Sequence, residues 1–388
     1  MSTTSESGPR VVVVGTGQIG AVHVECARRA GARVVGVLGS SIDRAQPKAR
    51  AWGIDKVYSG IDELLDDKDV DVVHVASPNH LHAEQAIAVA QAGKHVVCEK
   101  PLALNANSAL HMVEAAESAG VVNATCFNFR FYPLMHEAHA MRLNGELGTP
   151  RFLTGSYHQD WLFEETDWNW RLDASRAGDL RAVADIGSHW LDLLSWISGS
   201  RVAAVCADLH TFLPTRYRPD GEVETFSGAS TSKGVPVEIN TDDAASVLLR
   251  LQDGARGSFS VSQISAGRKN DLRFELAGSR RALMWSSEAS DTLWIGRRGR
   301  TSEVLLKDPV HLSEQARSVA FYPGGHVEGY AEAFTALFAA VYTDVARGVP
   351  CQSPTYPTFV DGYLGACVAD AIRTSAHMGQ WTAVEYER

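Results

Sequence analysis

The sequence predicts an α/β protein of two domains, the first built on a doubly wound parallel sheet and the second an α+β domain with an open, largely antiparallel sheet. A glycine-rich loop follows directly on an apolar strand near the N-terminus, and strands and helices then alternate with short connections to about residue 125. Beyond that point, longer strand-like segments follow one another with turn residues between them. A chain of 388 residues is long enough for two such domains.

The N-terminal domain is expected over residues 1–127. Val11 to Val14 form a β-branched run that stops at Gly15, which is typical of a strand buried on both faces. Further strands are expected over 33–38, 56–58, 70–76 and 95–98, with helices from Gln18 and over 45–52, 62–66 and 83–92. In such a fold, the carboxyl ends of the strands share one edge, and that edge binds the ligand.

The C-terminal domain is expected over residues 128–388. Its strands are predicted over 151–157, 203–208, 244–251, 255–262, 272–278 and 282–285. The spacing of apolar residues predicts a helix from Ala182 to Ile197 and two more helices over 329–347 and 356–376. For the last helix, packing back on the N-terminal domain is one of the arrangements considered. Residues 227–236 are rich in Gly, Ser and Thr and are expected to form a loop.

Composition favours a small-molecule ligand. The net charge of -10 gives no basic surface for nucleic acid or for anionic membranes, and no apolar run approaches the ~20 residues of a membrane span. Six scattered cysteines without a CxxC pair indicate reduced thiols and a cytoplasmic protein. No metal site is predicted: His80 and His82 alternate on a loop without adjacent Cys or Asp ligands, and His136 and His139 are expected at the surface.

The glycine-rich loop has the spacing of a dinucleotide-binding turn of the Rossmann type. It follows an apolar strand and opens a helix, and that context makes GxGxxG specific. Gly15 permits the tight turn, Gly17 lets a pyrophosphate approach the backbone, and Gly20 lets helix and strand pack closely. With Gln18 and Ile19, these residues are predicted to bind the cofactor at the helix N-terminus.

The second strand favours NADP over NAD. An acidic residue that would bind the ribose 2'-hydroxyl of NAD is missing after Leu38, where Ser40 and Ser41 stand instead. Arg44, shortly after, would pair with a 2'-phosphate. Asp43 remains an alternative carboxylate for the hydroxyl.

Two later strands end in polar residues at the same predicted edge. Pro78, Asn79 and His82 follow one strand and are candidates for cofactor contacts. Glu99-Lys100-Pro101 ends the next, where a lysine would cost desolvation unless it had a polar partner or task; a surface lysine at a turn is the alternative.

Asp185 and His189 lie four residues apart on the predicted helix 182–197, and Asp192 continues the same stripe. A carboxylate beside an imidazole is suited to moving a proton. An ordinary solvated helix face would give the same periodicity.

These motifs together resemble the Gfo/Idh/MocA oxidoreductases, the family of glucose-fructose oxidoreductase and inositol dehydrogenase, over nearly the whole chain. The resemblance implies that Lys100 bonds the reacting oxygen, that Pro101 is cis, that His189 is the acid/base and that Asp185 orients the pair. It also implies that Asn79, His82 and Glu99 lie beside the cofactor. In place of the family's Gly-Gly pair before the aspartate, this chain has Ala177-Gly178-Asp179.

Between the domains' junction and the catalytic helix, the chain is rich in aromatic and hydrogen-bonding residues. Such a mixture suits the apolar face and hydroxyl rim of a sugar ring, and a Trp-rich core or a subunit interface is the equal alternative. The candidate substrate-binding residues are Arg130, Tyr157, Asp160, Trp161, Trp170, Asp185 and His189.

The expected function is an NAD(P)-dependent hydride transfer to or from a secondary alcohol or ketone of a sugar or cyclic polyol. A redox glycosidase with tightly bound cofactor and a non-catalytic dinucleotide or sugar sensor are the alternatives. The resemblance further implies a homodimer or homotetramer formed through the C-terminal sheet.

Overall fold

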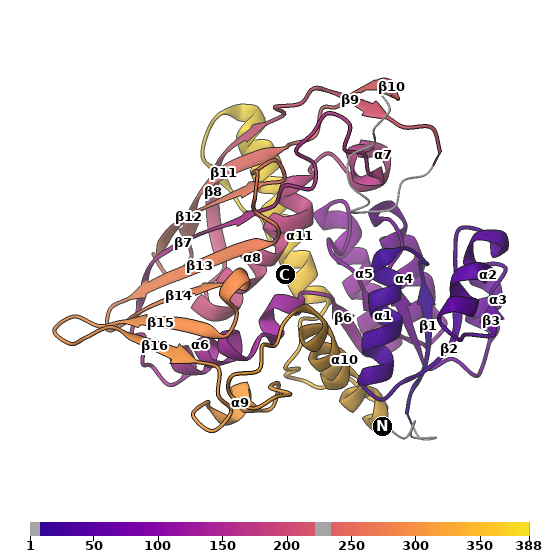
Figure 1. Ribbon diagram of the computed structural model, residues 1–388, viewed down its shortest axis with the longest axis horizontal. Helices are drawn as coiled ribbons and strands as arrows, with labels where there is room; N and C mark the ends of the chain where they lie inside the picture. The colour runs from indigo at the N-terminus through magenta and orange to yellow at the C-terminus, as the bar shows by residue number, and fades with distance from the viewer. Residues whose placement is uncertain (1–7, 222–233, 388) are drawn as a thin grey trace. The chain divides into compact units, whose positions relative to one another are not determined.

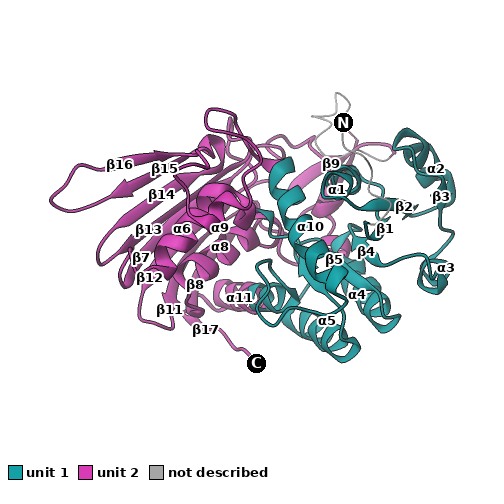
Figure 2. Ribbon diagram, turned by 90° about the horizontal axis from the view of Figure 1, so that it is seen from below, with its two compact units in different colours: residues 1–128, 331–366 teal, residues 129–330, 367–388 magenta. Residues whose placement is uncertain are grey.

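The computed structural model of the chain describes residues 8–221 and 234–387. These residues form two compact units (Figure 2). Unit 1 contains the chain up to Asn128 together with Ala331–Ala366, and unit 2 contains Phe129–Tyr330 and Cys367–Arg388. Within the described residues, no helix combines the length and the apolar composition needed to cross a bilayer.

Unit 1 is built on a parallel sheet of six strands in the order β3-β2-β1-β4-β5-β6 (Figures 1 and 2). The strands are β1 (Arg10–Val14), β2 (Arg33–Leu38), β3 (Lys56–Val57), β4 (Val72–Val75), β5 (His95–Cys98) and β6 (Asn123–Thr125). The strand order reverses between β1 and β4, which is the point where doubly wound sheets bind nucleotides. The predicted fold of this part is confirmed.

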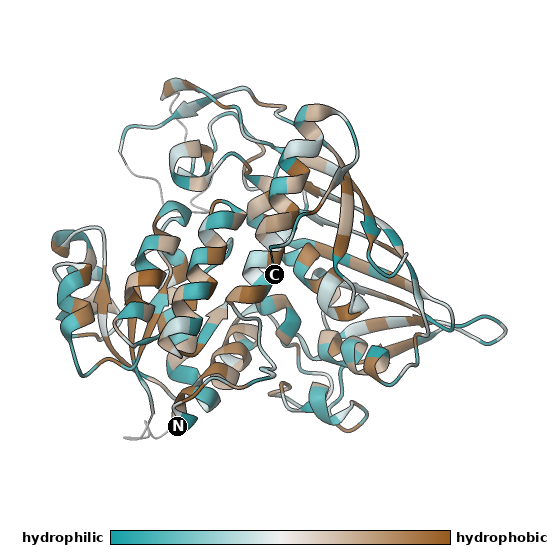
Figure 3. Ribbon diagram, turned by 180° about the vertical axis from the view of Figure 1, so that it is seen from behind, coloured by the Kyte–Doolittle hydropathy of each residue, from teal (hydrophilic) through white to brown (hydrophobic). Residues whose placement is uncertain are grey.

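The helices of unit 1 come from both stretches of its chain. They are α1 (Gln18–Arg29), α2 (Ile42–Ala51), α3 (Ile61–Asp66), α4 (His82–Gln91), α5 (Ala106–Ala119) and most of α10 (Tyr330–Arg347). Hydrophobic and hydrophilic residues alternate along these helices, as expected of helices that pack on a sheet (Figure 3). Helix α10 packs beside α1, where Arg29 forms an ion pair with Glu332 at 2.8 Å.

Unit 2 is built on a sheet of nine strands in the order β16-β15-β14-β13-β7-β12-β11-β8-β17. Among the described residues, only the β7–β12 pair of this sheet is parallel, which confirms the predicted open, largely antiparallel sheet. Its strands are β7 (Pro150–His158), β8 (Val202–His210), β11 (Ala244–Leu251), β12 (Arg256–Ser262), β13 (Asp271–Gly278), β14 (Ala282–Ser286), β15 (Thr292–Gly296), β16 (Glu303–Leu306) and β17 (Thr382–Ala383).

A small two-stranded sheet of β9 (Thr215–Arg218) and β10 (Val235–Glu238) also belongs to unit 2. Most of the loop predicted over 227–236 lies outside the described residues, but its last two residues, Val235 and Pro236, belong to β10. The β-branched residues of β10 pair with β9 in antiparallel register, and this long-range pairing decides the local conformation.

Helices α6 (Pro133–Leu143) and α8 (Ser188–Ser198) lie along one face of the large sheet (Figure 1). The unit also contains the short α7 (Ala174–Ala177) and α9 (Glu314–Arg317), and the end of α11 (Phe359–Met378). Trp190 of α8 fixes the packing: its indole donates to the carbonyl of Arg273 at 2.9 Å, and it lies so close to Gly155 that a Cβ there would be 2.1 Å from the indole nitrogen.

One prediction for α6 is wrong. His136, expected at the surface, is buried between the rings of Phe131 and Trp196. Burial lowers the pKa of His136 to about 3, so the ring is neutral. His139 is half-buried and stacks on Trp196, with ring centroids 4.2 Å apart.

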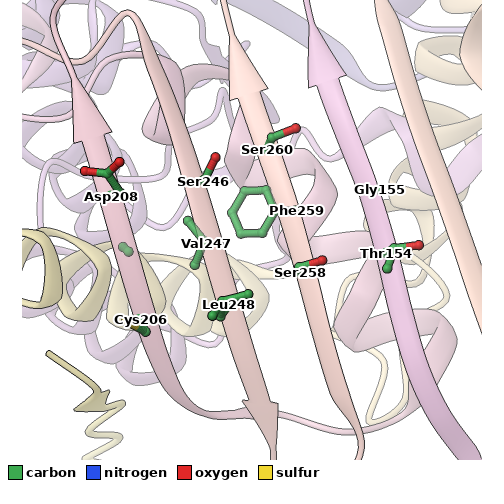
Figure 4. A pocket seen from close by; sticks show the side chains of 11 residues that line it. Thr154, Gly155, Cys206, Asp208, Ser246, Val247, Leu248, Ser258, Phe259 and Ser260 are labelled. Atoms are coloured by element: carbon green, nitrogen blue, oxygen red, sulfur yellow. The ribbon is translucent and has the colours of Figure 1, made fainter.

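The opposite face of the large sheet carries exposed side chains and a shallow hollow of about 500 Å³ (Figure 4). The strand registers align a row of residues across eight strands on this face. From β16 to β8 the row consists of Val304, Trp294, Met284, Glu275, Thr154, Ser258, Leu248 and Cys206. Three of its apolar members are well exposed: Val304 by 59%, Leu248 by 51% and Met284 by 41%.

Candidate active site

The glycine-rich loop of unit 1 leads from β1 into α1, and its three glycines meet different surroundings. A Cβ at Gly15, where φ is +108°, would lie 2.3 Å from the carbonyl oxygen of Ala76, and a Cβ at Gly20 would lie 2.0 Å from that of Gly15. A Cβ at Gly17 would meet nothing within 4 Å. Gly15 and Gly20 are therefore required by the protein's own packing, whereas the space at Gly17 is open to a ligand.

The N-terminus of α1 fits the pyrophosphate of a dinucleotide. Gly17 occupies the N-cap position and has no side chain to bond the amides of the first turn, which includes Gln18 and Ile19. Gln18 is exposed beside it. Amides at a helix N-terminus, together with the helix dipole, stabilise an anion.

The residues after β2 that are predicted to bind a 2'-phosphate differ from one another in their surroundings. The Ser41 hydroxyl accepts from the Arg44 amide at 3.4 Å and caps α2. Ser40, Asp43 and Arg44 are exposed. Of the two serines, Ser41 therefore has a structural role in the helix, and Ser40 does not share it.

The loops that follow β4 and β5 are joined by His82. Its ring nitrogens lie 2.9 Å from the carbonyl oxygen of Pro101 and 2.8 Å from that of Ser77. The Lys100–Pro101 peptide bond is cis. Asn79, immediately after Pro78, is buried, and His82 starts α4 with its side chain also buried. The structure thus gives His82 the role of holding the two loops together.

Glu99 is buried at the end of β5 and Lys100 is half-buried. One carboxylate oxygen of Glu99 lies 3.0 Å from His23 Nε2, and the other accepts from the Lys100 amide at 3.1 Å. Burial by itself raises the pKa of Glu99, but the hydrogen bond and charge of His23 and the charge of Lys100 outweigh it and bring this pKa below its usual value. Glu99 is therefore a carboxylate at neutral pH.

In unit 2, Asp185 and His189 lie at the start of α8 but not in one continuous α-helix. Residues Val183–Gly187 form a π-helical turn, so the expected regular helix from Ala182 is wrong over its first turn. Asp185, His189 and Asp192 are all buried, which excludes the solvated helix face. Such a turn often marks a functional site, because it displaces a side chain from its regular position.

Asp185 is held by side chains from distant parts of unit 2. Gln263, just after β12, donates to its Oδ2 at 2.9 Å, and Arg171 Nε lies 3.3 Å from its Oδ1. His189 packs edge-on against Phe129, with ring centroids 4.9 Å apart, and is tilted against Tyr157 at 6.2 Å. A fixed carboxylate and an imidazole in an aromatic surrounding can together accept and release a proton.

The π-helical turn is in turn held by Asp242. Its carboxylate accepts the amides of Arg181 at 2.6 Å and Val183 at 2.9 Å. Burial raises the pKa of Asp242 to about 6. The adjacent Asp243 forms buried ion pairs with Arg181 and Arg216, which anchors the same segment.

The candidate substrate residues of unit 2 all have partners within the unit. Tyr157 donates to Asn270 Oδ1 at 2.5 Å, Asp160 pairs with Lys269 at 2.7 Å, and Trp161 donates to Gln159 at 2.8 Å. Trp161 also packs on the small cluster Leu162, Leu172 and Ile239. Part of the aromatic segment therefore forms a core of its own.

Arg130 and Trp170 are likewise engaged. Arg130 forms a buried bidentate pair with Asp192, and Trp170 lies under the guanidinium of Arg171 at 4.5 Å. Arg171 therefore links Trp170 to Asp185. A role of Arg130 or Trp170 in substrate binding stays a prediction.

Sequence reasoning missed Gln263 and gave no role to Asp242. Neither residue is near Asp185 in the chain, since Gln263 is 78 residues away. Gln263 reaches Asp185 from the end of β12, and no local pattern in the sequence reveals that placement. A charged pair in the turn before β11, Asp242-Asp243, is the one signal that a search for buried carboxylates would have found.

Comparisons with known proteins identify both units. A family model described as an oxidoreductase family with an NAD-binding Rossmann fold matches residues 9–127, and the GFO/IDH/MocA C-terminal domain matches residues 135–284. The levoglucosan dehydrogenase of Pseudarthrobacter phenanthrenivorans is 31% identical over 88% of this chain and 86% of its own length. The myo-inositol 2-dehydrogenase of Thermotoga maritima is 29% identical over 70% of this chain and 73% of its own length.

Solved structures agree with this assignment. A levoglucosan dehydrogenase in complex with NADH and levoglucosan superposes with a TM-score of 0.87, at 28% identity, over 97% of this chain and all of that one. An oxidoreductase domain protein from Kribbella flavida gives a TM-score of 0.88 at 30% identity, over 98% of this chain and all of the other.

Proposed function

The chain belongs to the Gfo/Idh/MocA family of NAD(P)-dependent oxidoreductases that act on sugars and polyols, and we propose which of its residues carry out the reaction. Unit 1 binds the dinucleotide, and unit 2 binds the sugar or cyclic polyol. Two pairs of chemically complementary residues carry the assignment: Lys100, whose amide bonds the buried carboxylate of Glu99, and His189, which is buried four residues after the fixed Asp185.

In the oxidation, His189 takes the proton of a secondary hydroxyl, and Lys100 donates a hydrogen bond to the oxygen as its negative charge grows. Asp185 orients His189 and stabilises its protonated form. The bound nicotinamide dinucleotide supplies the acceptor for the hydride. The reverse reaction uses the same groups, with His189 returning the proton.

Absorbance at 340 nm with a panel of sugars tests the activity. The panel contains the compounds named for the relatives, namely levoglucosan, L-sorbose, myo-inositol and 1,5-anhydro-D-fructose. Net formation or consumption of NAD(P)H is expected with at least one of them. Cleavage of a glycoside with no net change in cofactor would instead identify a redox glycosidase, and dinucleotide binding without turnover would identify a sensor.

Substitution of Lys100 tests the mechanism. Lys100→Ala should lower kcat by about 100-fold or more, because removing one donor to a developing oxyanion costs about 3 kcal/mol. The Kd of the cofactor should change much less. Retained turnover would remove Lys100 from the mechanism.

For the cofactor, NADP is proposed as the preferred form. The absence of an acidic residue at the end of β2, with Ser40 and Arg44 exposed there, supports a 2'-phosphate. The ratio of kcat/KM for NADP to that for NAD should exceed 1 and should fall below 1 in Ser40→Asp, which restores a carboxylate. A wild-type ratio below 1 would assign NAD, with Asp43 as the residue to test next.

A homo-oligomer formed through the exposed face of the large sheet is also proposed. The aligned row supports it, because Val304, Met284 and Leu248 are exposed apolar side chains on the same face of one sheet, and exposed apolar surface is typical of a protein interface. Light scattering during gel filtration should give a dimer or a tetramer. The double variant Leu248→Arg and Met284→Arg should be monomeric; if its mass equals that of the wild type, the interface lies elsewhere.

We further place the protein in the cytoplasm. The six cysteines are free, and four of them, Cys26, Cys98, Cys126 and Cys367, are buried. Free thiols are typical of a reducing compartment. Fractionation of the host cell, with this protein found in the periplasmic or secreted fraction, would contradict the placement.

A further inference from the structure

A chain of buried polar side chains runs through the core of unit 1 and ends on Glu99. Tyr342 Oη lies 2.9 Å from His74 Nε2, His74 Nδ1 lies 3.0 Å from His23 Nδ1, and His23 Nε2 lies 3.0 Å from Glu99 Oε1. His23 and His74 are completely buried, and Glu99 and Tyr342 are each 5% exposed.

The four residues come from four different elements. His23 lies on α1, His74 on β4, Glu99 after β5 and Tyr342 on α10, more than 240 residues further along. Phe338 of α10 packs against both imidazoles, with ring centroids 5.1 Å from His23 and 4.6 Å from His74. Aromatic rings therefore pack around the hydrogen-bonded side chains. In such surroundings hydrogen bonds are strong, and an unpaired polar group costs free energy.

The ionised end fixes the direction of the hydrogen bonds. Because Glu99 is a carboxylate, His23 Nε2 carries a hydrogen and donates to it. Burial lowers the pKa of His74 well below its usual value, so its ring is neutral, and burial raises that of Tyr342, which keeps its proton. In the His23 tautomer with its hydrogen on Nε2, Nδ1 is an acceptor, so His74 Nδ1–H donates to His23 Nδ1 and the Tyr342 hydroxyl donates to His74 Nε2. The opposite direction with neutral rings would require a protonated Glu99.

The other titratable groups around Glu99 leave this arrangement unchanged. The thiols of Cys98, its neighbour in the chain, and of Cys126, after β6, have pKa values raised well above normal by burial, so both are neutral. Lys100 carries the remaining charge on the same segment.

We propose that His74 and Tyr342 are positioning residues for Lys100. By fixing the tautomer of His23, they keep Glu99 ionised and oriented, and the second oxygen of Glu99 accepts the Lys100 amide at 3.1 Å. They thereby fix the position of the backbone from which the Lys100 side chain extends, and they keep the negative charge of Glu99 next to it. This inference rests on the proposed role of Lys100.

A metal site is the alternative interpretation of this group of residues. The ligand atoms of His23, Glu99 and Cys126 lie within 4.8 Å of one another. However, His23 and Glu99 already bond each other at 3.0 Å, and the buried thiol of Cys126 would have to lose its proton to bind an ion. The hydrogen bond between His23 and Glu99 accounts for two of these three residues without an ion.

Tyr342→Phe removes only the last hydroxyl of the chain and is the test. We expect kcat to fall about tenfold, as is typical when an outer hydrogen-bonding partner is removed. The acidic limb of the kcat–pH profile should move to higher pH, because Glu99 is then protonated more readily. The KM of the sugar and the Kd of the cofactor should stay within about twofold.

The matched control is Tyr356→Phe. Tyr356 is also a buried tyrosine of unit 1, and its hydroxyl donates to Asp344 of α10 at 2.8 Å, away from the chain that ends on Glu99. Its pH profile should equal that of the wild type. An unshifted profile in Tyr342→Phe, or equal losses of kcat in both variants with equal profiles, would overturn the proposal.

Two further measurements separate the possible failures. If Lys100→Ala retains turnover, the proposed function is at fault; if it is inactive while Tyr342→Phe has the wild-type profile, the positioning role is at fault. In the wild-type protein, ¹⁵N NMR of the histidine rings should find the hydrogen on Nε2 of His23 and on Nδ1 of His74, whether or not the variants fold. The opposite tautomers, or stoichiometric zinc that disappears in His23→Ala, would overturn the proposal.

Discussion

The two units hold their functional groups in different ways. In unit 1, the cofactor loop is defined by the backbone: glycines at positions 15 and 20 leave no room for a side chain, and the polar residues follow directly on strands. In unit 2, Asp185 sits on an irregular turn and is held by side chains from elsewhere in the chain, chiefly Gln263, Arg171 and Asp242.

The difference teaches how each half should fail. A site defined by the backbone has no side-chain partner that can relax, so one added methyl group should weaken it strongly. A site held by several side chains loses its function in steps, as each partner is removed. Substitutions in the two units should therefore differ in the size of their effects, and the largest effect is expected in the glycine-rich loop.

Gly20→Ala should weaken cofactor binding more than any other substitution in this series. The new Cβ would lie 2.0 Å from the carbonyl oxygen of Gly15, so the loop must move. The Kd of the dinucleotide, measured by fluorescence titration, should rise by about 100-fold, since overpacking costs about 1–3 kcal/mol and each 1.4 kcal/mol is a factor of ten.

Gly17→Ala and Gly60→Ala refine this test. Both glycines are helix N-caps with nothing within 4 Å of a Cβ, so both variants should keep the wild-type Tm. Only Gly17→Ala should weaken cofactor binding. Equal affinities of these two variants would show that the pyrophosphate does not approach Gly17.

Asp242→Ala should destabilise unit 2 by about 2–3 kcal/mol, because two buried amides lose their acceptor. Urea unfolding measures this loss. Asp242→Asn keeps one acceptor oxygen and should lose about half as much. The cofactor Kd should be unchanged in both variants; if it rises with the loss of stability, the two halves are not independent.

Gln263→Ala should lower kcat about tenfold, since a hydrogen bond to a charged group contributes about 1.5 kcal/mol. The carboxylate of Asp185 keeps Arg171, so activity is reduced and not abolished. Steady-state kinetics at saturating cofactor measure the change. An unchanged kcat would mean that Arg171 alone holds Asp185.

The smallest effect concerns pH and α6. The unfolded chain protonates His136 near its ordinary pKa of 6.5, but the folded protein does so only near 3, so the unfolded state binds more protons between these values. The contribution of the neutral, buried His136 to stability is therefore complete above pH 6.5 and is lost as the pH falls. His136→Phe should lose about 0.7 kcal/mol less than the wild type between pH 7 and pH 6, measured by urea unfolding. Parallel losses would mean that another group dominates this range.

The same contrast explains what could be predicted from the sequence. The loop of Gly15, Gly17 and Gly20 is a local pattern, and the strand before it and the helix after it are equally local, so the motif identified both the fold and the cofactor class. Lys100 follows the same logic, because it ends a strand whose neighbours are predictable.

The rest depends on contacts between distant segments. Gln263 meets Asp185 because the turn at Val183–Gly187 packs against β12, and no periodicity in the sequence predicts that contact. The π-helical turn at 183–187 has the same apolar spacing as a regular helix, so the expected helix was wrong there. His136 looked like a surface residue because the pattern of α6 does not reveal that Trp196 covers it.

The return of α10 to unit 1 has a consequence for how the protein is made. During synthesis, residues 8–128 leave the ribosome long before Tyr342 does. The new Rossmann segment then has the imidazoles of His23 and His74 in its core, but it lacks the Tyr342 hydroxyl that completes their hydrogen bonds. It also lacks Phe334 and Phe338, which pack against these rings. Unit 1 therefore completes its folding only after α10 has been synthesised. A chain truncated near residue 128 would stay at that unfinished stage.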